Sequence, residues 1–371
     1  MRGGSNEQSS FCLMINLEEK VPQDHPLRAI KRRCHVIFRE MSADFRAAYS
    51  RYGRPGIPPE RLLKALLLQA LYSIRSEIQL MQAIDYNLLY RWFLDLGDAP
   101  VWTPEVFSMN RQRFDEHNLV RKFFDRVVAE ALIEQLASPD HFTVDGTLIR
   151  SWASLKSLRP REGEARHDDE DRGNPLVNFH GERRTNATHV SATDPEAMLA
   201  KKGKGKEAHL CHSGHVLMEN RNGLCLDIAV DAADGRAERR NARQMLARVC
   251  RRHRLSPKTL GADAGYNDGP FLDAVENVDG VVPHVPINSK TIVARDAAGD
   301  ARSRAQARMR STSYAISQRI RKRVEEIIGW LKTVGGMARA RLVGRWKIAQ
   351  TALATGAAYN LLRIVRLERA T

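Results

Sequence analysis

Three acidic residues lie at positions where a carboxylate could take part in chemistry. Asp145 lies inside the alternating segment 141–149 (HFTVDGTLI), which predicts a β-strand, and Asp is disfavoured within strands. Asp263 lies at the carboxyl end of a second predicted strand, where open α/β sheets bind their ligands. Glu325 lies in the predicted helix 314–332. A sheet with these strands side by side would bring the three carboxylates together.

Carboxylate oxygens are the ligands that hard divalent cations prefer. A two-ion site needs ions about 3.5–4 Å apart and a bridging carboxylate. We expect Asp145, at the centre of the sheet, to be that bridge, and Asp263 and Glu325 to complete one ion each. A lone Asp at a strand end is more often a turn cap than a catalyst. The hypothesis of two Mg²⁺ ions, replaceable by Mn²⁺, therefore depends on all three carboxylates together.

The helix that carries Glu325 holds a second chemical signal. Gln318, Arg321, Glu325 and Lys332 are separated by three, four and seven residues, so they share one face of a continuous helix. A carboxylate for metal, flanked by fixed cations for phosphate, is what a phosphodiester active site requires. Taken alone, the pattern favours a simple exposed Arg–Glu pair, which stabilises a helix by about 0.2–0.5 kcal/mol.

Other residues are candidates for DNA contact. Trp330 is suited to stack on an extruded base, although a Trp on such a helix is more often part of the core. Four lysines in one short run are expected to follow DNA phosphates without reading sequence: Lys201, Lys202, Lys204 and Lys206. His209, Cys211 and His215 share one strand face, but their spacing matches no zinc finger, so zinc is not expected there.

The charge of the chain favours a polyanionic partner. The formal net charge is +15 and the pI is about 9.9. Residues 300–371 contain sixteen Lys or Arg against four Asp or Glu, so +12 lies in this tail. Such an excess implicates nucleic acid but does not separate an enzyme from a binding protein. No apolar run is long enough for a membrane span, and five cysteines without CxxC spacing fit a reducing cytoplasm.

The first third of the chain is predicted to be all helical. Helices over about 62–73, 76–84 and 87–96 follow one another closely, as in a helix-turn-helix unit. Trihelical packing without DNA contact explains the same pattern equally well. We therefore predict an all-α N-terminal domain over residues 1–137, with a DNA-binding or accessory role.

The remainder, residues 138–371, is predicted to be an α/β domain. The order is a strand, a hairpin of two strands, a helix, a strand, a helix, a strand and a helix. This is the order of a ribonuclease-H-like domain with a mixed five-stranded sheet and helices. Two segments interrupt it: a basic insertion at about 154–208, read as a long loop, and a polar, Arg-rich insertion at about 288–313.

Seven segments carry a resemblance to a known family: 24–30 (DHPLRAI), 57–63 (IPPERLL), 72–77 (YSIRSE), 144–148 (VDGTL), 218–223 (MENRNG), 261–266 (GADAGY) and 321–332 (RKRVEEIIGWLK). They resemble bacterial DDE insertion-sequence transposases, in particular the insertion-sequence-five branch. The resemblance extends from Asp24 to Arg366. It places the family's acidic triad on Asp145, Asp263 and Glu325.

The family's helix signature of Tyr, Arg, Glu and Lys falls on Gln318, Arg321, Glu325 and Lys332, so Gln replaces the first member here. Glu326 adjoins Glu325 but points about 100° away around a helix, and the spacing to Arg321 and Lys332 selects Glu325.

The resemblance implies metal-dependent cleavage at the ends of an insertion sequence, followed by attack of the freed 3′-hydroxyl on target DNA. It implies terminal inverted repeats and target DNA as partners, a homodimer or higher oligomer on DNA, and a place at the bacterial nucleoid in the cytoplasm. Two alternatives stay open. One is a domesticated or inactive copy that only binds DNA, and the other is a ribonuclease-H-like nuclease that cuts without strand transfer.

Overall fold

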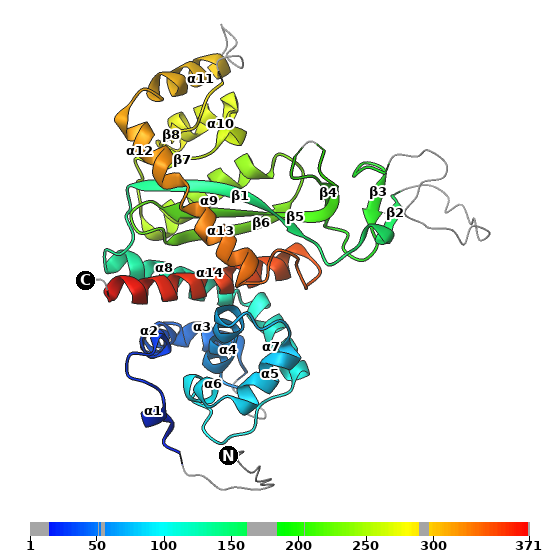
Figure 1. Ribbon diagram of the computed structural model, residues 1–371, viewed down its shortest axis with the longest axis vertical. Coiled ribbons are helices and arrows are strands. Elements are labelled where there is room, and N and C mark those ends of the chain that lie inside the picture. Colours follow the sequence, from blue (N-terminus) through cyan, green and yellow to red (C-terminus); the bar gives the residue numbers. More distant parts are fainter. Residues whose placement is uncertain are drawn as a thin grey trace, which may run out of the picture.

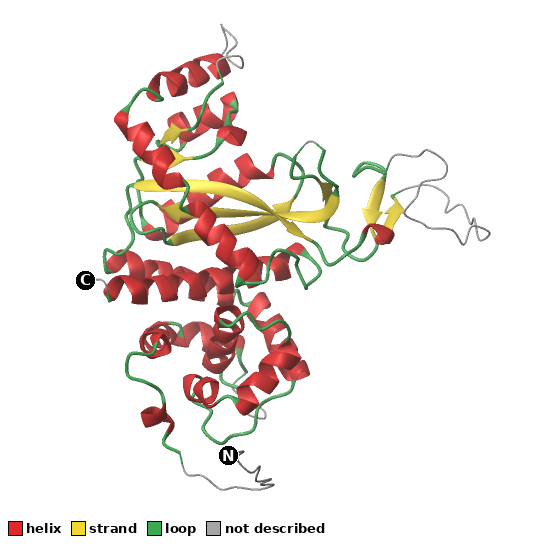
Figure 2. Cartoon of the chain, in the orientation of Figure 1, coloured by secondary structure: helices red, strands yellow, loops and turns green. Residues whose placement is uncertain are grey.

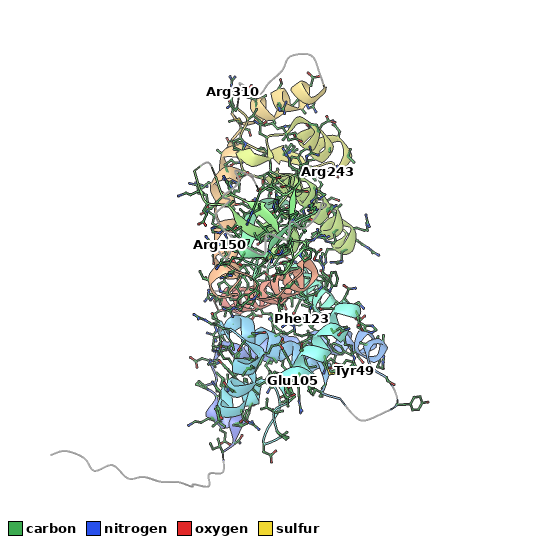
Figure 3. All side chains as sticks on the ribbon, turned by 90° about the vertical axis from the view of Figure 1, so that its right-hand side faces the viewer. Tyr49, Glu105, Phe123, Arg150, Arg243 and Arg310 are labelled. Atoms are coloured by element: carbon green, nitrogen blue, oxygen red, sulfur yellow. The ribbon has the colours of Figure 1, made fainter. Side chains whose placement is uncertain are left out.

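The computed structural model describes residues 15–50, 52, 56–161, 184–203, 205–288 and 297–369. The molecule is elongated, with the N-terminal helices at one end, the sheet in the middle and α11 at the other end (Figures 1 and 2). The same arrangement is visible from the side, where Glu105 and Tyr49 lie toward one end and Arg310 lies at the other (Figure 3).

All regular secondary structure in the described residues before 137 is helical, as predicted. The helices are α1 Leu17–Lys20, α2 Pro26–Glu40, α3 Ser42–Ala48, α4 Pro59–Leu71, α5 Glu77–Tyr86, α6 Leu88–Phe93, α7 Pro104–Glu116 and α8 Leu119–Ile133. Local sequence explains several of the boundaries. Pro59 occupies the first turn of α4, where its missing N–H costs nothing. The Ser76 hydroxyl accepts the Gln79 N–H at 3.1 Å and so caps α5.

The strands of the main sheet are β1 His141–Arg150, β4 Met198–Ala200, β5 His209–Glu219, β6 Cys225–Ala232, β7 Thr259–Gly261 and β8 Val282–His284. They run in the order β6–β5–β1–β7–β8, and β4 pairs with the start of β5. Strands β1, β5 and β6 are antiparallel, whereas β7 and β8 run parallel to β1. The ribonuclease-H-like order is confirmed, with β4 as one strand more than predicted.

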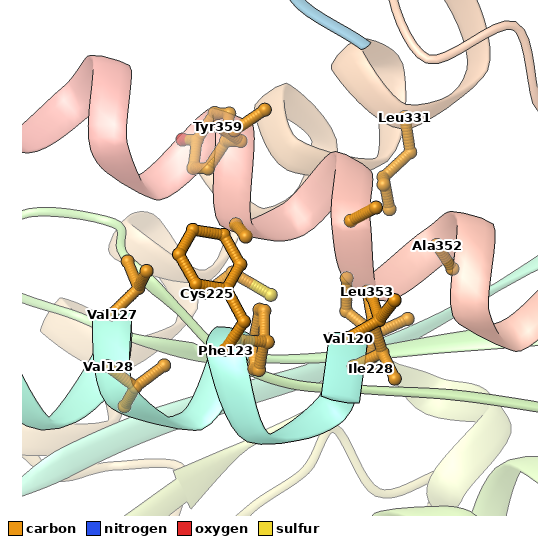
Figure 4. Close-up of a cluster of buried hydrophobic side chains, with 14 of the residues drawn as sticks. Val120, Phe123, Val127, Val128, Cys225, Ile228, Leu331, Ala352, Leu353 and Tyr359 are labelled. Carbon is orange, nitrogen blue, oxygen red and sulfur yellow. The ribbon is translucent and has the colours of Figure 1, made fainter. Parts of the chain in front are cut away.

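Helix α9 (Ala237–His253) covers one side of the sheet, where it packs on β1, β5 and β6. The helix α14 (Arg345–Glu368) packs on β6 and α8, and also on α4 and α2 of the N-terminal region. In Figure 4, Phe123 and Val127 of α8 meet Cys225 of β6 and Tyr359 of α14. One hydrophobic core therefore extends from the N-terminal helices into the sheet.

The basic insertion predicted as a long loop contains structure. Its described residues form a 3₁₀ turn (Leu155–Ser157) and a small antiparallel pair, β2 (Leu158–Pro160) and β3 (His189–Ser191). Four small or medium side chains bury one another beneath it: Ala153, Leu158, Ala197 and Leu210. So small a core leaves little periodic signal in the sequence. Residues 162–183 and Lys204 lie outside the described residues.

The polar, Arg-rich insertion predicted at about 288–313 contains a helix for which no sequence signal was identified. Its described residues contain α11 (Ala297–Arg308), which packs on α10 (Gly269–Asp273). Over residues 300–308, where side-chain burial is described, the buried residues are the small Ala301 and Ala305, so the usual apolar stripe is missing there. Arg304 and Arg308 pair with Glu276, in the π-helical segment Ala274–Val278. Ion pairs thus replace part of the apolar contact. Residues 289–296 fall outside the described part.

The helix predicted over 314–332 is two helices. α12 (Thr312–Arg321) ends before Lys322 and Arg323, and α13 (Val324–Thr333) begins after them. Each half has its own packing partner, because α12 packs on β7 and β8 whereas α13 packs on β5 and α14. A straight helix would not follow both surfaces.

No helix in the described ranges combines the length and apolarity needed to cross a bilayer. Four cysteines in these ranges, Cys34, Cys211, Cys225 and Cys250, are free thiols.

The contact between α14 and the sheet yields a stability prediction. A Cβ added to Gly356 would lie 2.5 Å from Cδ1 of Ile228 and 3.0 Å from Cε2 of Phe124, both buried side chains. Gly356→Ala should lower the free energy of unfolding by about 1–3 kcal/mol, because overpacking outweighs the helix propensity of Ala. Chemical denaturation of the purified protein measures this change.

Gly329 of α13 is the matched control, since an added Cβ there meets nothing within 4 Å. Gly329→Ala should raise the free energy of unfolding by about 0.5–1 kcal/mol. An equal gain from both variants would show that α14 is not packed closely on β6.

Candidate active site at the centre of the sheet

The structure brings Asp145, Asp263 and Glu325 together from three elements. Asp145 is in the middle of β1 and its side chain is 19% exposed. Asp263 follows β7, the parallel neighbour of β1, and Glu325 is in the first turn of α13. Burial raises the pKa of Asp145, and the negative charges of Asp263 and Glu325 raise it further. The three carboxylates therefore lie within electrostatic reach of one another.

Asp263 also performs the structural role that strand-end aspartates often have. Its Oδ1 accepts the Gly265 N–H at 2.8 Å and caps the 3₁₀ turn Ala264–Tyr266. One oxygen is thus used locally, and this hydrogen bond fixes the direction of the carboxylate.

Arg321 is the cation closest to the carboxylates. Its Nη1 lies 4.0 Å from Oδ2 of Asp145, and its positive charge lowers the pKa of Asp145, as does the N–H of Gly146. Arg321 Nε donates to Oε1 of Gln318 at 3.2 Å. The guanidinium is therefore held at the end of α12, facing the first strand.

Gln318 connects α12 to the sheet. Its amide nitrogen donates to the carbonyl oxygens of Ala262 at 3.2 Å and His284 at 2.6 Å, directly after β7 and at the end of β8. Both the nitrogen and the oxygen of the Gln318 amide therefore make hydrogen bonds within the protein, since the oxygen accepts from Arg321. The expected DNA contact of Gln318 stays a prediction, and the contacts described here are structural.

The break between α12 and α13 separates residues that were predicted to share one helical face. Burial lowers the pKa of Lys332, and the positive charge of Lys202 lowers it further. The thiol of Cys211 is also close enough to act on Lys332. Cys211 is five residues along β5 from Val216, the partner of Asp145, which corresponds to about 17 Å of strand. The structure therefore brings Arg321, but not Lys332, to Asp145.

The other candidates for DNA contact lie farther from the carboxylates. Trp330 is half-buried and packs edge-on against Tyr359 of α14, with ring centroids 5.7 Å apart. Lys201, Lys202 and Lys206 are exposed, next to β4 and the start of β5, and Lys204 is outside the described residues. Lys202 and Lys332 thus belong to one basic surface beside the amino-terminal end of β5.

The structure separates Glu325 from its neighbour Glu326. Glu326 Oε1 lies 2.8 Å from Nη1 of Arg363 on α14, whereas the charge of Glu325 acts on Asp145. The two adjacent carboxylates therefore face different parts of the molecule.

Sequence reasoning missed a fourth carboxylate, Glu238, in the first turn of α9. Its Oε1 lies 3.2 Å from the position that a Cβ on Gly146 would take. Its Oε2 lies 3.4 Å from the corresponding position on Gly265. Burial raises the pKa of Glu238, and the charges of Asp263 and Asp145 raise it further. An acidic residue in the first turn of a helix is common for electrostatic reasons, so the sequence held no distinctive signal.

The chemistry of these donors fits a divalent cation. All are carboxylates, the oxygen ligands that Mg²⁺, Mn²⁺ and Ca²⁺ prefer, and their repulsion is offset nearby by one arginine at 4.0 Å. Within the described ranges, no three His, Cys, Asp or Glu side chains stand in ligand geometry. The fit is therefore one of donor type and charge, and the side chains must rotate toward a shared ion.

Two family models match the chain. A model described as a transposase domain of the DUF772 type matches residues 15–113, and a model described as a transposase DDE domain matches residues 185–361. The chain belongs to the DDE transposases of the insertion-sequence type. The comparisons with curated proteins and with solved structures gave no match.

This family membership defines the activity in general terms. The protein is a DNA transposase, an enzyme that cleaves and rejoins phosphodiesters, and its family generally uses divalent metal ions. Asp263, Glu325 and Glu238 lie within the second match, whereas Asp145 lies between the two matches.

The contacts of Gln318 give a prediction that separates a structural role from DNA binding. Gln318→Ala should lower the free energy of unfolding by about 1–3 kcal/mol without DNA, because the carbonyls of Ala262 and His284 each lose the hydrogen bond from its amide. Arg319→Ala, on an exposed position of the same helix, should change it by less than about 0.5 kcal/mol. Unchanged stability of Gln318→Ala together with weaker DNA binding would assign Gln318 to DNA instead.

Proposed function

We propose that Asp145, Asp263 and Glu325 form the catalytic triad of this transposase and bind two Mg²⁺ ions, with Mn²⁺ as a substitute. The observation that carries the proposal is the convergence of three carboxylates from β1, the end of β7 and α13 on one place beside Arg321. When bound, such ions supply a nucleophilic water at neutral pH and neutralise charge on the phosphoryl group.

The protein's own groups have separate tasks in this proposal. Asp145 lies within the pairing of β1 with β5, opposite Val216, so its backbone is held in place by the sheet. Arg321 lies where negative charge develops on the phosphoryl oxygens and stabilises that charge. Gln318 acts through Arg321, because its amide oxygen holds the guanidinium and its nitrogen is bonded to the sheet.

The DNA path in this proposal continues from the carboxylates to the basic surface of Lys202 and Lys332. The exposed lysines Lys201 and Lys206 lie beside it, and their charge suits phosphates at a distance from the cleaved bond. The substrates are the terminal inverted repeats of an insertion-sequence-five-like element and its target DNA. The protein acts as a homodimer or higher oligomer on DNA, at the bacterial nucleoid.

Replacing each triad carboxylate by its amide tests the site. Asp145→Asn, Asp263→Asn and Glu325→Gln should each lower the rate of end cleavage by about 10³-fold or more, because several kcal/mol of metal stabilisation are lost. DNA affinity should be retained. The measurement is single-turnover cleavage of a labelled end in Mg²⁺, with strand-transfer products followed on the same gel.

Glu326→Gln is the matched control, since its carboxylate pairs with Arg363. It should cleave at nearly the wild-type rate. An inactive Glu326→Gln beside an active Glu325→Gln, or full cleavage in EDTA, would contradict the proposal.

The position of Lys332 gives a second test. Lys202→Ala and Lys332→Ala should each flatten the salt dependence of DNA binding by about 0.9 in the log–log slope. Neither should change the cleavage rate on saturating DNA.

Arg321→Ala should lower that rate by about 10²-fold with a smaller loss of affinity, because its charge acts on the transition state. Arg319→Ala is the control on the same helix. Equal losses of rate and affinity for Arg321→Ala and Lys332→Ala would show that both belong to a general basic surface.

A further inference from the structure

Glu238 reaches the catalytic carboxylates from the opposite side of the sheet. Side chains alternate along a strand, so Asp145 faces α12 and α13 while position 146 faces α9. In the described structure β7 pairs with β1 only as far as Thr143, so the two faces of β1 meet at an open edge beside Asp145 and Gly146. Position 146 is a glycine, and a Cβ there would lie 3.2 Å from both Cγ and Oε1 of Glu238. The missing side chain at 146 leaves the space through which Glu238 approaches the strand.

Gly265, in the 3₁₀ turn Ala264–Tyr266 that follows β7, opens the same approach. A Cβ at this position would lie 3.0 Å from Oδ1 of Asp263 and 3.4 Å from Oε2 of Glu238. The carboxylates of Asp263 and Glu238 therefore flank one glycine. Two glycines, after Asp145 and after Asp263, give Glu238 access to both aspartates.

Glu238 has no compensating partner in the described part of the chain, where its oxygens make no hydrogen bond or ion pair. The nearest charges include Asp263 and Asp145, which repel it, and Arg239, which attracts it. A half-buried carboxylate beside two others costs free energy unless a cation neutralises the group. A purely structural role would instead favour a partner such as an arginine.

Two buried polar side chains without partners face the same place. The hydroxyl of Tyr266 has no hydrogen-bond partner, and the residue is 1% exposed. His215 is fully buried, neither ring nitrogen has a partner, and its Nδ1 lies 3.3 Å from the Cβ position of Gly146. Unpaired buried polar groups cost about 1–3 kcal/mol each, so two of them beside Glu238 point to a polar ligand there.

We propose that Glu238 is a fourth cation ligand and shares a divalent ion with Asp145 and Asp263, while Glu325 serves from the other side of the sheet. Tyr266 and His215 are then placed to hydrogen-bond the water that a hydrated Mg²⁺ retains. This inference rests on the proposed function, because it requires Asp145 and Asp263 to hold the ion. It makes the site a tetrad of carboxylates.

The competing explanation is that Glu238 only stabilises the amino-terminal end of α9 through the helix dipole. The two explanations predict opposite effects on the metal-free protein. Loss of a helix-dipole interaction lowers the melting temperature in EDTA, whereas relief of carboxylate repulsion raises it. Mn²⁺ binding separates them further, because only a ligand contributes to it.

The experiment uses the full chain with Glu238→Gln, Asp145→Asn and Asp263→Asn. Free Mn²⁺ is titrated by electron paramagnetic resonance, and thermal unfolding is recorded in EDTA and in Mn²⁺. Glu238→Gln should raise the melting temperature in EDTA, weaken Mn²⁺ binding by about tenfold or more, and reduce the stabilisation by Mn²⁺. Glu326→Gln, which removes a carboxylate paired with Arg363, should bind Mn²⁺ as the wild type does.

The outcomes distinguish this inference from the proposed function. Wild-type Mn²⁺ affinity in Glu238→Gln, together with weak binding in both aspartate variants, overturns the role of Glu238 and leaves the triad intact. Wild-type affinity in the aspartate variants overturns the proposed site itself. If Glu238→Gln does not fold, Glu238→Asp is measured in its place. This variant keeps the negative charge, but its side chain is one methylene shorter. Wild-type Mn²⁺ affinity in Glu238→Asp would then refute the inference.

Discussion

Carboxylates of like charge repel one another, and this sheet holds several of them in one place. The charge of Asp263 raises the pKa of both Asp145 and Glu238, which are already destabilised by burial. The arrangement persists because strand pairing fixes Asp145 opposite Val216 of β5, and β7, which carries Asp263 after its end, pairs with β1 just before Asp145. Backbone hydrogen bonds and core packing elsewhere must exceed this local cost.

Much of the packing that offsets the cost of carboxylate repulsion involves α14. This helix joins β6, α8, α4 and α2, and its Asn360 side chain bonds both the N–H and the carbonyl of Cys225 in β6. At its far end Glu368 pairs with Arg33 of α2, which also binds Glu130 of α8 and Glu134 directly after it. Burial lowers the pKa of Arg33 but these three carboxylates raise it overall, so the guanidinium stays charged. The sheet and the N-terminal helices are thereby held in one core.

The parts of the fold and site that depend on local sequence patterns could be predicted from the sequence. The strand of Asp145, the Asn-Gly hairpin before β6 and α9 all follow from alternation, turn residues and helical periodicity, and the structure has them. The helix break at Lys322 and Arg323 could not be predicted, because it depends on where two distant surfaces lie. The same holds for Glu238, whose neighbours Gly146 and Gly265 are far away in sequence. Helix α11 was not predicted, because ion pairs and small alanines take the place of an apolar stripe.

The position of α14 has a consequence for synthesis. α14 is translated after every element against which it packs, since α2, α4, α8 and β6 all precede it in the chain. Until residues 345–368 have left the ribosome, the apolar faces of those elements lack their cover, and the carboxylates around Asp145 lack the rigid support behind their sheet. Competence to cut DNA therefore has to wait until residues 345–368 have been synthesised and have packed.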